Sequence, residues 1–231
     1  STLNIETGGD LWFWTTNTIP SNSRIAVFVH NGEVTGTTEL YVASKTKLSG
    51  SGTFGSNITF KANNNFTIEN NANIIFPSNL YIQGGGDLII DAGSTITLNR
   101  FYSTRSSSVV SNSGKIIFNS HDIFKAGQSS TVVFENFSGS TVEYAATSSS
   151  SGDFPIPKTS GGNSYYNLII SGTADCNLDL DIYNNLEISG TANGSSVVDI
   201  DGNLNVTGNA NCNWDLNIKG NWTNSGTFTN F

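Results

Sequence analysis

The feature that most constrains the fold of this chain is a repeat of 18 residues that runs from position 167 to the end of the sequence. Four asparagines follow one another at equal steps (185−167, 203−185 and 221−203 are each 18): Asn167, Asn185, Asn203 and Asn221. Five positions after each asparagine stands a glycine of a second series: Gly172, Gly190, Gly208 and Gly226. A fixed period of this kind is typical of a solenoid, in which each repeat forms one coil stacked on the next.

Within each repeat, apolar and polar residues alternate over short runs, such as Leu186-Glu187-Ile188 and Val198-Asp199-Ile200. Alternation with a period of two is typical of a half-buried strand. The intervening residues are mostly Gly, Thr, Asn and Ser, which favour turns. The sequence therefore predicts an all-β fold, a right-handed parallel β-helix (β-solenoid), with coils of roughly 18 residues in the C-terminal part.

In such a stack, each residue lies over the residue 18 positions later, at a distance of about 4.8 Å along the axis. Leu168, Leu186 and Leu204 then form one inward ladder. The four asparagines form a ladder at a turn, where stacked side-chain amides can hydrogen-bond along the axis. The four glycines are predicted to adopt backbone angles that other residues resist.

The polarity of the chain comes from uncharged side chains, since 36% of its 231 residues are hydrophobic and only 12% are charged. The net charge is −8, and no basic patch occurs, so we expect no nucleic-acid partner. No run of about 18 apolar residues is present, and no membrane span is predicted. The chain begins at Ser1 without any Met, and the repeat is still running at Phe231, which favours a processed chain or a segment of a longer one.

The two cysteines, Cys176 and Cys212, are two repeats apart (212−176 is 36), with Gly194 in the same register between them. Two coils correspond to a Cα separation of about 9.6 Å. A disulfide tolerates at most about 7 Å. Two free thiols at a small buried position are therefore predicted, with a disulfide as the alternative. No structural metal site is predicted, because His30 and His121 lie far away in the sequence.

The whole chain, residues 1–231, is predicted to form a single solenoid. Its expected segments are an irregular N-terminal cap region (1–40), uneven coils (40–146), a long loop (147–164) and the regular coils (165–231). Among the uneven coils, Leu48 and Phe66 are again 18 residues apart (66−48). The stretch Arg100–Arg105, followed by three serines, is predicted to be a protruding loop.

Residues 140–231 carry several motifs in a fixed order: Val142-Glu143-Tyr144, Phe154-Pro155-Ile156-Pro157, Tyr165-Tyr166-Asn167-Leu168-Ile169-Ile170-Ser171-Gly172, Asp201-Gly202-Asn203-Leu204-Asn205-Val206-Thr207-Gly208 and Gly220-Asn221-Trp222-Thr223-Asn224-Ser225-Gly226-Thr227-Phe228. This series resembles a recurrent module of very large surface proteins of Bacteroidetes. The first half of the chain resembles that module only in its general character and carries none of these motifs. The resemblance implies export through the type IX secretion route and a place on or outside the cell, as adhesin, filament or surface-layer material. It implies no catalytic residue.

The best candidate for chemistry is an acidic cluster in the regular coils: Asp179, Asp181, Asp199, Asp201 and Asp215. By the repeat, Asp181 lies beneath Asp199, and Lys219 lies over Asp201. We interpret the cluster as a solvated acidic face. One alternative is a weak Ca²⁺ site formed by Asp181, Asp199 and Asp201, because calcium relieves the repulsion of stacked carboxylates. No other cofactor is expected. The second alternative is a catalytic pair of carboxylates.

Three functions follow from these observations. The first is a non-enzymatic structural or adhesive solenoid at the cell surface or outside the cell, which associates head-to-tail with further copies or continues in a longer chain. The second is a carbohydrate-binding module that stacks aromatic side chains on surface glycans: Trp12, Trp14, Phe101 and Tyr102. For Trp12 and Trp14 the competing interpretation is the core of the N-terminal cap. The third is a β-helix polysaccharide lyase or hydrolase that uses Asp199 or Asp181.

Overall fold

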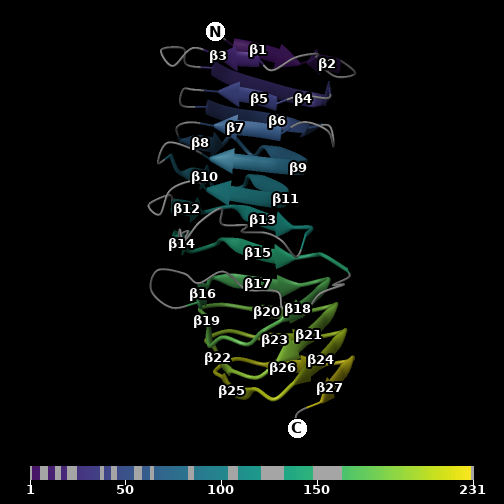
Figure 1. The fold of residues 1–231 in the computed structure, drawn as a ribbon. Coiled ribbons are helices and arrows are strands. Elements are labelled where there is room, and N and C mark those ends of the chain that lie inside the picture. Colours follow the sequence, from purple (N-terminus) through teal and green to yellow (C-terminus); the bar gives the residue numbers. More distant parts are fainter. Residues whose placement is uncertain are drawn as a thin grey trace.

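The computed structural model consists of short strands joined by turns. It describes residues 2–5, 10–13, 17–19, 25–36, 39–42, 46–54, 59–62, 65–82, 86–103, 109–120, 133–147 and 163–229, with side chains from Lys47 onward except at 59–62, 100, 102–103, 133 and 163. None of these residues is helical, and every strand pairing among them is parallel. The strands follow one another in layers from the N-terminal to the C-terminal end (Figure 1).

Three ladders of parallel strands form the first part of the stack. The first ladder contains β1 (Thr2–Ile5), β4 (Ile25–Gly36), β6 (Thr46–Phe54), β8 (Phe66–Ile68), β10 (Leu88–Ile90), β12 (Val109–Asn112) and β14 (Val133–Asn136). The second ladder contains β2 (Asp10–Phe13), the later halves of β4 and β6, β9 (Asn73–Ile82), β11 (Thr95–Ser103), β13 (Lys115–Phe118) and β15 (Thr141–Tyr144). The third ladder contains β3 (Asn17–Ile19), β5 (Glu39–Val42), β7 (Thr59–Ala62) and the later halves of β9 and β11.

The second ladder continues into the C-terminal coils, where two further sheets accompany it. Its later members are β17 (Asn167–Ile170), β20 (Leu186–Ile188), β23 (Leu204–Val206) and β26 (Trp222–Asn224). One accompanying sheet contains β16 (Asn163–Tyr165), β19 (Leu180–Ile182), β22 (Val197–Ile200) and β25 (Asp215–Ile218). The other contains β18 (Thr173–Asp175), β21 (Thr191–Gly194), β24 (Asn209–Cys212) and β27 (Thr227–Thr229).

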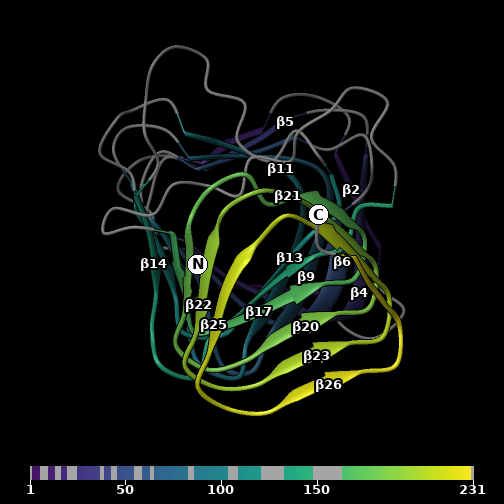
Figure 2. The ribbon, with the colours of Figure 1, turned by 90° about the horizontal axis from the view of Figure 1, so that it is seen from below.

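The coil is right-handed. Seen from the C-terminal end, the chain passes from β25 on the left through β26 at the bottom and up the right-hand side to the C-terminus (Figure 2). It therefore runs counterclockwise while it approaches the viewer, which is the sense of a right-handed coil. The predicted all-β, right-handed parallel β-helix is confirmed.

The regular coils have the predicted length. Leu168 pairs with Leu186 and Leu186 with Leu204, and the same inward ladder continues to Trp222. Hydrogen bonds between coils keep the same step, since Asn203 bonds to Asn185, 18 positions before it. Each coil therefore places equivalent residues directly above one another, as the repeat indicates.

The earlier coils are longer and uneven. Among four pairs that show this, Phe60–Leu80 has the shortest step (80−60 is 20) and Ile116–Val142 the longest (142−116 is 26), with Leu88–Val110 and Val110–Phe134 between them. The expected match between Leu48 and Phe66 is wrong, because Leu48 pairs with Ile68 and Phe66 pairs with Thr46. The coil here is longer than the regular ones, so the step of the regular coils does not connect equivalent positions.

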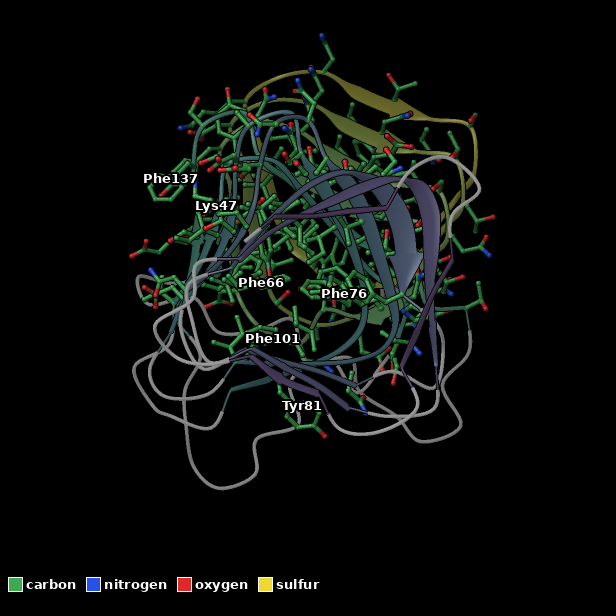
Figure 3. The ribbon with its side chains drawn as sticks, turned by 90° about the horizontal axis from the view of Figure 1, so that it is seen from above. Lys47, Phe66, Phe76, Tyr81, Phe101 and Phe137 are labelled. Atoms are coloured by element: carbon green, nitrogen blue, oxygen red, sulfur yellow. The ribbon has the colours of Figure 1, made fainter. Side chains whose placement is uncertain are left out.

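Large aromatic side chains fill the interior of these longer coils. Figure 3 places Phe66, Phe76 and Phe101 inside the stack and Phe137 and Tyr81 outside it. The ring of Phe76 stacks on that of Phe54 at a centroid distance of 4.5 Å. Such contacts along the axis let each coil bury the apolar face of the next one.

The prediction of a protruding loop at Arg100–Arg105 is wrong for residues 100–103, and Thr104, Arg105 and the three serines after them lie outside the described residues. Residues 100–103 belong to β11 and pair with Asn79–Ile82 of β9, and the side chain of Phe101 is 1% exposed. The polar residues Arg100 and Ser103 on either side of the two aromatic ones conceal the strand, because only the inward residue has to be apolar. Of the predicted loop 147–164, residues 148–162 lie outside the described residues, and β16 begins at Asn163.

Candidate functional site

The asparagine ladder lies where the chain enters the strands of the second ladder, and its side chains hydrogen-bond along the axis. The side-chain oxygen of Asn185 accepts hydrogen bonds from Asn203, from its side-chain amide at 3.0 Å and its backbone N–H at 3.1 Å. The side-chain oxygen of Asn203 accepts the backbone N–H of Asn221 at 2.9 Å. At Asn167 the donor is Asn184, at 2.8 Å, and not the equivalent Asn185. The predicted ladder is therefore present, with backbone groups replacing some of the amide donors.

The glycine ladder serves close packing, and the predicted unusual backbone angles are wrong. Positive φ values among the described glycines occur at Gly50, Gly93, Gly139 and Gly194, none of which belongs to the ladder. At Gly190, an added Cβ would collide with the backbone carbonyl oxygen of Gly172 in the coil before. The same kind of collision recurs at the other ladder positions: Gly172, Gly208 and Gly226. Glycine is needed at this corner because successive backbones stack there without room for a side chain.

The two thiols are free and buried, as predicted. Gly194 pairs with Cys212, which confirms that a coil separates Cys212 from Cys176. Burial raises the pKa of both thiols, to about 12 for Cys212. The Sγ of Cys212 donates a hydrogen bond to the carbonyl oxygen of Ala192 at 3.2 Å. Both groups are therefore protonated at neutral pH and act as small core residues.

A polar groove follows the corner at the ends of β19, β22 and β25. Two short ladders of side chains border it: Asp181, Asp199 and Asn217 within the strands, and Tyr183, Asp201 and Lys219 just beyond them. The predicted stacking of Asp181, Asp199 and Asn217 is confirmed by their pairing. The two ladders are separated by two residues along each strand, about 6.6 Å. Between them, Ile182 and Ile200 point into the core, so backbone forms the floor.

Hydrogen bonds along the axis hold two carboxylates of the groove. Asn217 donates from Nδ2 to Oδ1 of Asp199 at 2.8 Å. The Nζ of Lys219 lies 2.7 Å from Oδ1 of Asp201. This hydrogen bond and the charge of Asp201 raise the pKa of Lys219. The amide and the ammonium thus fix the orientation of carboxylates that stack in successive coils.

The predicted cation site at Asp181, Asp199 and Asp201 remains a prediction. Among the side chains that the structure describes, no group of three or more His, Cys, Asp or Glu residues is placed to hold a metal ion. Asp199 and Asp201 already contact Asn217 and Lys219, as described above, so a bound cation would compete with these donors.

Tyr183 is the residue of this groove that sequence reasoning missed as a candidate. Its side chain is 56% exposed, and it borders a hollow of about 480 Å³ formed with the residues of the two ladders. The available signal was its place two residues after Asp181, at the corner position occupied by Asp201 and Lys219 in the following coils. Its ring therefore lies outside the core, beside the polar groups of the groove.

The residues predicted to stack on glycans do not come together as one site in the described part of the chain. Phe101 is buried, so its prediction is wrong: β11 turns its ring into the core. Tyr102 lies in β11 and Trp12 in β2, and their side chains are not among those described. Trp14 lies outside the described residues.

The fold places the chain in the class of right-handed parallel β-helices. No family model, no curated protein and no solved structure matches it. Within the described ranges, no helix has the length and apolar character needed to cross a membrane.

Proposed function

We propose that this chain is a non-enzymatic structural or adhesive β-solenoid outside the cell, a segment or subunit of a bacterial surface protein or filament. The observation that carries the proposal is the second ladder, in which parallel strands pair from β2 to β26 without interruption. Each coil contacts its neighbours through backbone hydrogen bonds and stacked apolar side chains, which favours a stiff rod. The resemblance of residues 140–231 to surface modules of Bacteroidetes supports the location and the type IX secretion route.

The last described coil supports association along the axis. Trp222 occupies the inward ladder position that Leu204 holds one coil earlier, and yet its side chain is 50% exposed. Its ring contacts that of Phe228 at a centroid distance of 5.0 Å. No described strand pairs with the outer edges of β25, β26 and β27, so their backbone groups can accept a further coil. In head-to-tail association, a second copy of the chain would supply that coil.

Negative-stain electron microscopy of the purified protein, with and without Ca²⁺, tests the rod. We expect unbranched rods, and long fibres at high protein concentration if copies stack end to end. A change of Trp222→Ser should shorten such fibres, whereas Phe137→Ser, at a 48% exposed side chain on the flank, should leave them unchanged. Compact particles without a long axis would contradict the proposal.

Protease treatment of intact cells that produce the protein tests its location. Loss of the protein from undamaged cells, while a cytoplasmic marker survives, is the expected outcome. Protection of the protein until the cells are lysed would contradict a surface role.

A further inference from the structure

We infer that the groove along β19, β22 and β25 binds a carbohydrate chain, neutral or amine-bearing, with one sugar ring stacked on Tyr183. This inference is independent of the proposed rod function, since the groove requires only that the C-terminal coils are folded. It also differs from the glycan site expected from the sequence, which contained none of the residues of this groove. Three features carry it: an exposed ring, a lining of mixed hydrogen-bonding groups, and the sign of the charge.

The exposed ring of Tyr183 follows Tyr166 in its ladder and precedes two charged residues. The following coils carry Asp201 and Lys219 at the same corner, and the carboxylate and ammonium of these two residues pair with each other. The tyrosine ring therefore stands beside charged groups with more than half of its surface in water. An amphipathic ring in this setting offers an apolar face next to hydrogen-bonding partners, which is the combination that a sugar ring presents in return.

The other side chains of the groove both donate and accept hydrogen bonds. Asp181 and Asp199 supply carboxylate oxygens, Asn217 supplies an amide, and Lys219 supplies an ammonium group. Sugar hydroxyls also donate and accept, so they can satisfy either kind of group. Because Asn217 already orients Asp199 and Lys219 orients Asp201, less conformational entropy is lost when a ligand binds.

The charge and size of the groove restrict the ligand. Asp181, Asp199 and Asp201 outnumber the single ammonium of Lys219, so an anionic glycan would be repelled and an amine would be attracted. The hollow of about 480 Å³ falls within the usual range for small-molecule sites, roughly 300–1,000 Å³. The two bordering ladders run parallel to the stack axis, so a linear oligosaccharide would lie along the rod.

Isothermal titration calorimetry with three defined probes tests the inference: cellohexaose (neutral), a glucosamine hexamer (amine-bearing) and hexagalacturonate (anionic). The glucosamine hexamer should bind most tightly and lose affinity as salt is added, cellohexaose should bind more weakly, and hexagalacturonate should not bind. A Tyr183→Ala change should weaken binding of both active probes by about tenfold. Asp199→Asn should reduce the preference for the glucosamine hexamer over cellohexaose.

Phe137→Ala is the matched control, because Phe137 is similarly exposed on another coil and should leave every affinity unchanged. Far-ultraviolet circular dichroism must show the same spectrum for all variants, so that a loss of binding is not a loss of fold. The inference is overturned if the wild-type protein binds none of the three probes, if it prefers hexagalacturonate, or if the Tyr183→Ala variant binds as the wild-type protein does. None of these outcomes affects the proposed rod, which electron microscopy tests separately.

Discussion

The coils before residue 147 and the coils after residue 165 share one continuous ladder but enclose differently filled interiors. The earlier coils take longer and more variable steps than the later ones, as the pairs Ile116–Val142 and Leu168–Leu186 show. Buried aromatic residues crowd the earlier part and extend to the first strand of the later one: Phe54, Phe66, Phe76, Phe101, Phe118, Phe134, Tyr144 and Tyr165. In the later coils, where Trp214 is also buried, β18, β21 and β24 bury one alanine each: Ala174, Ala192 and Ala210.

Coil length and core side-chain volume therefore vary together. A longer coil encloses a wider cross-section, which has to be filled to the density of a protein interior. Phenylalanine and tyrosine supply that volume in the earlier coils, and alanine keeps the later coils narrow. Strand pairing is insensitive to the change, since Ile116–Val142 and Leu168–Leu186 belong to the same ladder despite their different steps.

The largest effect is expected from removing an aromatic filler of the wide coils. Phe118→Ala should lower the free energy of unfolding by about 3–5 kcal/mol, because the ring is buried and stacks on Tyr144 at 5.6 Å. Urea titration monitored by circular dichroism measures the change. The control Phe137→Ala, at an exposed ring, should alter stability by no more than about 0.5 kcal/mol. Equal losses in the two variants would show that the wide core does not depend on its aromatic residues.

The reverse change should harm a narrow coil. Ala192 pairs with Ala174 on one side and Ala210 on the other, with no exposed surface. Ala192→Phe should therefore cost about 3 kcal/mol through overpacking. The same titration measures it, with Asn211→Phe, which points outward from the same sheet, as the control. If both variants are equally stable, the later coils have room for larger residues, which would contradict the link between coil length and core volume.

An intermediate effect is expected at the glycine corner of the narrow coils. Gly190→Ala should destabilise the protein by about 2 kcal/mol, because the new Cβ collides with the carbonyl oxygen of Gly172 and forces two coils apart. Thermal unfolding measures this loss of stability. The control is Ser189→Ala, a change at an exposed neighbouring residue. A wild-type melting temperature in Gly190→Ala would mean that the corner opens easily and does not fix coil spacing.

The smallest effect concerns Glu143, in the strand where the last long coil meets the first regular one. Burial raises the pKa of its carboxyl. Hydrogen bonds from Lys115 and Ser171 and the charge of Lys115 together lower the pKa by more than burial raises it, so the net shift is downward. A carboxyl whose pKa is lowered in the folded state stabilises the protein at neutral pH. This stabilisation is lost as the pH falls through the pKa of the folded state.

Glu143→Gln should therefore cost about 1 kcal/mol at pH 7 and less as the pH falls from about 5 to about 3. Urea titrations of both proteins at each pH measure the difference. A difference that grows on acidification would have the wrong sign for this contact.

Much of the regular part could be predicted from the sequence because its step is constant. The stacking of Asp181, Asp199 and Asn217, the outward carboxylates and the two separated thiols all follow from the single repeat period. The aromatic interior of the earlier coils and the strand character of residues 100–103 did not follow, since variable steps hide which positions are equivalent.

The ladders of the regular coils follow from the sequence: alternation sets which side chains face inward, and equal spacing sets which residues stack. The packing at the corners becomes visible only once the coils are stacked. There, glycine is required by the backbone of the preceding coil and not by its own angles, and the stacked residues Tyr183, Asp201 and Lys219 border a hollow. The reason is physical: strand pairing repeats along the chain, whereas corner geometry depends on contacts between coils that no local pattern encodes.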